Sequence, residues 1–320
     1  MIERWVRFWE RREGPASLAL TRILVGLVLF ADFGQIAVRG LVPGLWLAPP
    51  RGLGFGAAED GAPALLRWLG ATPAAVTALW AVVVLGALGV SLGWALREAA
   101  LAAALGSALL GHLAPSGERA IDALLRIVLV VLALSRADAS WSLRSRFERG
   151  RGREPVRSIP AWPRQLLFAQ LVWVYFSAAH NRSGPGWWPS GHLAALSHVL
   201  SDPHFAVFSP GWTRAVYPLT QVATALTMTF ELGAPLLFAL TFLDRHPERG
   251  GALGRLVRRL HLRWAFLALG AGLHLGIAVT MRLGIFPFGM LALYPLFLHP
   301  SELSEGLARG WRVACAWRVE

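Results

Sequence analysis

Long apolar runs recur along the chain, and they constrain its fold more than any other feature. The first run, residues 17–38, contains only two charged side chains, Arg22 and Asp32. A transmembrane helix needs about 20 consecutive, mostly apolar residues, and several of the runs reach that length. The runs lack the period-two alternation of strands and exceed the length of ordinary strands. The sequence therefore predicts an all-α fold, a polytopic membrane helical bundle.

About eight transmembrane helices are predicted from these runs. They fall at residues 17–38, 72–96, 98–113, 121–135, 164–182, 214–242, 263–281 and 284–300. Only 16% of the residues are charged and 55% are hydrophobic, whereas soluble proteins carry roughly a quarter charged residues. We expect residues 1–300 to form one transmembrane helical domain and residues 301–320 to form a cytoplasmic C-terminal tail.

The basic residues predict an orientation. All 31 of them are arginine, and none is lysine. With the N-terminus inside, 22 arginines fall in the predicted inner segments and seven in the outer ones, as expected for a cell-membrane protein with both termini cytoplasmic. The outer segment 183–212 then faces away from the cytoplasm. The inner segment 145–160 is predicted to be a linker, and since it has no interleaved aromatic residues, the expected partner is the bilayer and not a nucleic acid.

Six polar side chains interrupt the predicted spans. They are Arg22, Asp32, Asp122, Arg126, Glu231 and His274. Such groups in hydrocarbon face a protein interior or a watery cavity, so each marks a candidate functional site. Asp122 and Arg126 are four residues apart and are expected to pair on one helix face. Arg22 and Asp32 each require a partner elsewhere in the fold.

A shared pocket is one interpretation of these residues, and separate structural pairs are the other. With the predicted orientation, Asp32, Asp122, Arg126, Arg182 and His274 all fall in the outer half of the bilayer. A carboxylate such as Glu231 must be protonated or bound to a cation there. Since the sixth and seventh spans are consecutive, Glu231 and His274 are expected to line one cavity.

His274 and the segment Tyr175–Gly191 carry the other candidate groups. Gly272 and Gly276 flank His274 and predict the close approach of another helix. The segment reads YFSAAHNRSGPGWWPSG and places His180, Asn181 and Arg182 at the end of the fifth span. A metal site built from His180, His192, His198 and His204 is not favoured. The six-residue spacing of the last three does not place ligands on one helix face.

Several motifs together resemble the HTTM family, the membrane domain shared with vitamin K-dependent γ-carboxylase. In chain order they are SLALTRILVGLVLFAD, DALLRIVLVVLALS followed by SWSL, YFSAAHNR, FELGAP and HLGIAVTMRLGIFPFGMLALYPLFL. The resemblance implies a reduced, vitamin K-like quinone as cofactor and matches Tyr175 and Trp187 to the family pattern. It places Arg182 at the position of the carboxylase lysine, the base of that reaction. Arginine stays protonated and cannot act as that base.

Three functions remain open at this point. The first is a γ-carboxylase-like membrane enzyme for a quinone-like or other lipid-soluble substrate at the outer face. The second is a non-catalytic lipid- or quinone-binding protein that assists a partner, and the third, a transporter, is disfavoured because internal repeats are not evident. The expected catalytic residues are His180, Arg182 and His274. The expected substrate-binding residues are Tyr175, Asn181, Trp187, Glu231, Arg126 and Asp32. A peptide substrate is also compatible with the resemblance, and no metal is expected.

Overall fold

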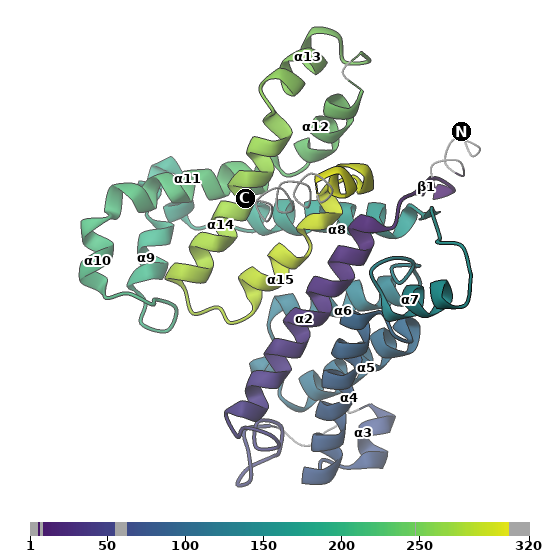
Figure 1. The fold of residues 1–320 in the computed structure, drawn as a ribbon. Helices are drawn as coiled ribbons and strands as arrows, with labels where there is room; N and C mark the ends of the chain where they lie inside the picture. Colours follow the sequence, from purple (N-terminus) through teal and green to yellow (C-terminus); the bar gives the residue numbers. More distant parts are fainter. Residues whose placement is uncertain (1–5, 7–8, 55–62, 247, 307–320) are drawn as a thin grey trace, which may run out of the picture. The chain divides into compact units, whose positions relative to one another are not determined.

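A computed structural model describes residues 6, 9–54, 63–246 and 248–306. The chain is mostly helical, at 71%, as the composition predicts. One antiparallel pair of two-residue strands, β1 (Arg12–Glu13) and β2 (Ile159–Pro160), departs from the all-α expectation. The chain divides into two compact units. The first unit comprises Met1–Leu167 and Ala292–Glu320, and the second comprises Phe168–Leu291 (Figure 1).

The first unit is built on four long helices that follow one another in the chain. They are α2 (Ala16–Val38), α4 (Pro73–Leu92), α5 (Leu96–Leu113) and α6 (Ala120–Ala133). Each of these helices packs against the next, α2 on α4, α4 on α5 and α5 on α6. The short elements of this unit are α3 (Ala64–Leu69), η1 (Pro115–Gly117), α7 (Leu143–Gly150) and η4 (Tyr294–Phe297).

Local sequence sets the ends of α4 and its contact with α2. The Thr72 hydroxyl accepts a hydrogen bond from N of Ala75, and Pro73 occupies the first turn, where no amide donor is needed. Gly93 ends the helix in the left-handed conformation, with φ of 64°. Gly26 lets the two backbones approach, because an added Cβ would lie 2.5 Å from N of Ser91.

The second unit contains a broken helix where one span was predicted. Helices α11 (Tyr217–Gly233) and α12 (Leu236–Arg245) meet at an angle of 72°, so the continuous helix predicted at 214–242 is wrong. Pro235 lies in the break, directly before α12, and it interrupts the helix because proline has no N–H to donate to the preceding turn. The other helices of this unit are η2 (Pro185–Trp187), η3 (Pro189–Gly191), α9 (Ala195–Ser201), α10 (Pro210–Ala215), α13 (Gly251–Arg259) and α14 (Leu262–Thr280). Helices α8 (Trp162–His180) and α15 (Phe286–Ala292) each contribute residues to both units.

Three described helices are long and apolar enough to cross a membrane, namely α2, α4 and α14. The number is four if the bent pair counts as one span. The other predicted spans are also helical but shorter or less apolar, so the total of eight and the orientation stay predictions. The linker predicted at 145–160 is wrong in part, because it begins in α7 and ends in β2. The predicted tail lies outside the described residues from 307 onward.

Candidate functional site

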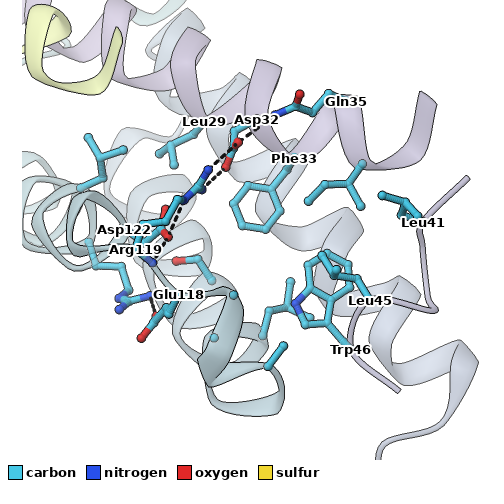
Figure 2. A pocket seen from close by; sticks show the side chains of 18 of the residues that line it. Leu29, Asp32, Phe33, Gln35, Leu41, Leu45, Trp46, Glu118, Arg119 and Asp122 are labelled. Carbon is cyan, nitrogen blue, oxygen red and sulfur yellow. Dashed lines mark hydrogen bonds and ion pairs between the residues drawn. The ribbon is translucent and has the colours of Figure 1, made fainter. Parts of the chain in front are cut away.

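A cavity of about 230 Å³ lies in the first unit among α2, α5, α6 and the turns that follow α2 (Figure 2). Its apolar wall includes Phe33 and Trp46, whose rings stack at 8° with centroids 6.4 Å apart. Leu29 and Leu45 extend this wall, and Ile36 and aliphatic side chains of α5 and α6 complete it. The shape and chemistry of this wall suit a flat apolar group.

Charged side chains form the other end of the cavity. The Arg119 Nη2 donates to Oδ2 of Asp32 at 2.7 Å and to Oδ1 of Asp122 at 2.8 Å. Asp122 also accepts from the Arg119 backbone N at 2.8 Å, which caps the start of α6. Gln35 donates to Asp32 at 3.0 Å. This network supplies Asp32 with the partner that the sequence required.

The charge on Arg119 is permanent. Burial lowers the pKa of its guanidinium, but hydrogen bonds to Asp122 and Asp32 outweigh burial and raise the pKa above its usual value. Two carboxylates therefore enclose one fixed cation at the edge of an apolar cavity. A group bound beside them meets both hydrogen-bond acceptors and a guanidinium.

A second ion pair, between Arg126 and Glu118, lies beside this network. The pairing of Asp122 with Arg126 predicted from their spacing is therefore wrong, because each takes a partner from the turn before α6. Gly111 makes room for the Glu118 carboxylate, since an added Cβ would lie 2.2 Å from its Oε1. Glu118, Arg119, Asp122 and Arg126 all line the cavity.

Tyr175 and His274 form a buried polar pair in the second unit. The Tyr175 hydroxyl lies 2.7 Å from Nε2 of His274, joining α8 to α14. Both residues are 4% exposed. Aromatic rings surround them: Phe230 contacts Tyr175 edge-on with centroids 4.8 Å apart, and Phe286 lies 5.8 Å from the His274 ring.

Arg182 is engaged by three groups at the end of α8. Its Nη2 donates to Oε1 of Glu231 at 2.9 Å, and Nη1 contacts the other carboxylate oxygen. The guanidinium carbon lies 4.1 Å from the Trp187 ring centroid, and Trp188 Nε1 donates to O of Arg182 at 3.1 Å. Arg182 thus joins the broken helix α11 to the start of the segment 183–212. Arg182 is therefore the cation that Glu231 was predicted to need if it is not protonated.

His180 and Asn181 lie at the exposed end of α8. His180 stacks on Phe176 with centroids 6.2 Å apart, and Asn181 donates to O of Ser177 at 2.8 Å. These are contacts within the end of one helix. Across the part of the chain that the structure describes, no three His, Cys, Asp or Glu side chains gather as a metal site requires.

Seven of the nine predicted site residues fall into three groups, and His180 and Asn181 join none of them. Asp32 and Arg126 line the cavity of the first unit, Arg182 contacts Glu231 and Trp187, and Tyr175 pairs with His274. Glu231 and His274, which are expected to line one cavity, contact different residues, Arg182 and Tyr175, and the shared cavity stays a prediction. Gly272 and Gly276 do not receive a helix, since no atom of another described element lies within 4 Å of their Cβ positions. They lie two residues from His274, on the opposite face of α14.

Arg119, Glu118 and Gln35 are site residues that sequence reasoning missed. Arg119 and Glu118 lie in a predicted surface turn, where charges are ordinary. The available signal was an arginine three residues before Asp122, at the position that caps a helix. Gln35 follows Asp32 by three residues on α2, which places both on one helix face.

Arg22 does not line the cavity and has a structural role. It is fully buried and donates to O of Val90 at 2.6 Å, to O of Trp141 at 2.7 Å and to O of Ala137 at 3.2 Å. It also bonds O of Ser91, the residue after Val90 near the end of α4. The guanidinium thereby caps the C-terminus of α4 and fixes the turn that precedes α7. The sequence predicted that Arg22 needs a partner elsewhere in the fold, and backbone carbonyl groups are that partner.

Comparison with known proteins gives one match. A profile of the HTTM domain matches residues 10–244, which include α2 to α11 and most of α12. No curated protein and no solved structure matches the chain. The matched range contains the charged network of the cavity and the Arg182–Glu231 pair.

Proposed function

Since the chain belongs to the HTTM family, we propose that this membrane protein takes a lipid-soluble, quinone-like molecule into the cavity of the first unit. The proposal rests on one observation: an aromatic wall, made by Phe33 and Trp46, and the Asp32–Arg119–Asp122 network line the same cavity. Ligand sites are mostly apolar hollows with a few placed polar groups. This cavity has that composition.

The size of the cavity favours a ring over a long chain. Its volume of about 230 Å³ is below the roughly 300–1,000 Å³ of sites for drug-sized ligands, so one substituted ring fits better. The ring faces Phe33 and Trp46, and offset or edge contacts with them are favourable. A ligand hydroxyl donates to the carboxylates of Asp32 or Asp122, and a ligand carbonyl accepts from Gln35 or Arg126.

Glutamyl carboxylation is not included in this function. The position of the family's lysine holds Arg182, and arginine does not release its proton near neutral pH. The two-point contact with Glu231 commits the same guanidinium to an internal carboxylate. Binding, without carboxylation, is therefore the function that the geometry supports best.

An enzyme that removes a proton from a lipid-soluble alcohol or quinol is the second candidate. The observation that favours it is the 2.7 Å contact between the Tyr175 hydroxyl and Nε2 of His274. The tyrosine oxygen takes the substrate's hydroxyl proton as its own proton passes to the neutral imidazole. The products are the substrate anion and an imidazolium. Tyr175→Phe removes this relay, so turnover that survives the change excludes it.

A cavity-filling variant tests the proposed binding. The wild-type protein is purified in native lipid. Its lipid-soluble compounds are then extracted, and mass spectrometry identifies and quantifies them. Ile36→Phe extends a side chain into the cavity, so we expect the retained compound to fall at least tenfold. Leu101→Phe, at an exposed position of α5, is the matched control and should retain it. Equal retention by both variants would contradict the proposal.

A further inference from the structure

A second hollow, of about 190 Å³, lies on the first unit beside α7. The turn that precedes α7 contributes Ser140 and Trp141. Helix α7 contributes Ser145, Glu148 and Arg149, and Arg153 lies just beyond its end. The proposed function does not involve this hollow. Its floor comes from a turn, and its basic side chains come from a helix and the segment that follows.

Buried interactions fix the shape of the hollow. Arg22 holds the carbonyl oxygen of Trp141 at 2.7 Å, and Trp141 adopts a positive φ of 48° that few non-glycine residues take. Ser142 then caps α7, since its hydroxyl accepts from N of Ser145 at 2.9 Å. Asp138 fixes Arg144 through a contact of 2.7 Å. The turn and the helix are thus held in place before any ligand arrives.

The polar groups of the hollow suit an oxyanion. Residues 144–157 contain six arginines and two glutamates, and of these Arg149, Arg153, Glu148 and Glu154 line the hollow. Glu148 is already engaged by Arg144 at 3.1 Å and lies 3.9 Å from Nη1 of Arg153. Arg149 uses Nε to donate to O of Ser145 at 3.2 Å, which leaves the terminal nitrogens of its guanidinium for a ligand. The buried Ser140 hydroxyl has no hydrogen-bond partner among the described residues.

Exposed aromatic rings lie at the hollow and elsewhere on α7. Trp94 is 54% exposed and Phe147 is 55% exposed, and their rings meet edge-on with centroids 5.4 Å apart. Trp141, at the hollow itself, is 43% exposed. Tryptophan beside arginine is typical of the boundary between lipid head groups and acyl chains. A soluble anion would make no use of these rings.

We propose that this hollow binds the phosphate head group of an anionic phospholipid. Arg149 and Arg153 hold the phosphate oxygens, because guanidinium groups bind phosphate through paired hydrogen bonds. Ser140 donates to the same group, and Trp141, which lines the hollow, contacts the acyl-chain boundary. A juxtamembrane arginine cluster attracts anionic lipid in the same way. This site does not depend on the ligand of the larger cavity.

The test measures lipid retained by the full-length protein. Protein in detergent is exchanged into phosphatidylglycerol or phosphatidylcholine, and bound lipid is counted by native mass spectrometry across a concentration series. We expect Arg149→Gln/Arg153→Gln to weaken phosphatidylglycerol binding at least tenfold and leave phosphatidylcholine binding unchanged. The control Arg51→Gln/Arg67→Gln removes the same charge from exposed positions elsewhere and should bind as the wild type does. Equal loss in both double variants would overturn the proposal.

A second measurement separates a lipid from a free phosphate. Trp141→Ala should reduce phosphatidylglycerol binding several-fold, because the acyl-chain contact is lost. Inorganic phosphate and glycerol phosphate should compete with phosphatidylglycerol only at far higher concentration. If soluble phosphate competes at equal concentration, the site binds phosphate without preference for a lipid, which contradicts the proposal. If the double arginine variant does not fold, Arg149→Gln alone gives the same readout.

Discussion

Arg182 and Glu231 form a two-point ion pair between the end of α8 and helix α11, with Nη2 of Arg182 2.9 Å from Oε1 of Glu231. Their side chains are 24% and 12% exposed, so water only partly screens the charges. The same arginine stacks on Trp187. An internal carboxylate therefore engages the guanidinium of Arg182, one of the expected catalytic residues.

The pair should show coupling in a double-mutant cycle. Arg182→Ala alone leaves the largely buried Glu231 carboxylate without its cation, so the second change, Glu231→Ala, should cost little more. We expect a coupling of about 1–3 kcal/mol in the free energy of unfolding. Chemical denaturation in detergent measures it. Glu231→Ala with His274→Ala is the comparison and should be closer to additive. Additivity of the Arg182–Glu231 cycle would contradict the ion pair.

Gly26→Ala should destabilise the packing of α2 on α4. An added methyl would meet backbone atoms of Ser91 and Ala87 at 2.5 and 2.7 Å, and backbone cannot rotate away. We expect a loss of roughly 1–3 kcal/mol in the free energy of unfolding. Gly34→Ala on the same helix meets nothing within 4 Å and should be neutral, or stabilising by up to about 1 kcal/mol. Equal unfolding midpoints for the two variants would rule this out.

Gly111→Ala should alter the cavity and spare the fold. Its methyl would displace the Glu118 carboxylate, the far end of a flexible side chain, away from Arg126. We expect a change in unfolding free energy below about 1 kcal/mol, with weaker binding of a short-chain quinone measured by thermal shift. Gly117→Ala also lines the cavity but meets nothing within 4 Å, so its binding should match the wild type. If Gly111→Ala binds the quinone with unchanged affinity, Glu118 has no part in binding the ligand.

Arg22→Met should be among the most destabilising single changes in the first unit. It leaves carbonyl groups of Val90, Ser91, Ala137 and Trp141 buried without their donor. We expect a loss of about 3–5 kcal/mol, the cost of breaking a buried charged network. Arg97→Met, an exposed position at the start of α5, should stay within about 0.5 kcal/mol. Similar denaturation curves for both variants would show that the bonds of Arg22 contribute nothing.

The orientation predicted from the arginines can be measured by cysteine labelling. Because the chain has one cysteine, Cys315→Ser gives a cysteine-free background. Ser190→Cys should react with an impermeant maleimide in intact cells. Arg157→Cys, from the predicted inner segment, should react only after permeabilisation. The side chains at both positions are exposed, so both can be labelled. A reversed labelling pattern would show that the predicted orientation is wrong.

The sequence by itself determined the helical membrane class of the protein and the position of its first long helix. Helix α2 was predicted at 17–38 and observed at Ala16–Val38, because apolar length and charge depletion are properties of a local stretch. The HTTM family was also readable, since its motifs occur in order along the chain. Helix breaks were harder to predict: the apolar run at 214–242 continues through Pro235, and only the fold shows the 72° bend.

Tertiary structure decided which buried charges meet. Spacing predicted Asp122 with Arg126, but Arg119 lies between Asp32 and Asp122, and Asp32 is 87 residues away in the chain. The approach of α2 to the start of α6 creates that site, and no local pattern encodes it. Arg22 shows the same limit, because its partners are backbone carbonyls, which every residue carries. A sequence reveals that a buried charge needs a partner, and the packing of distant helices selects it.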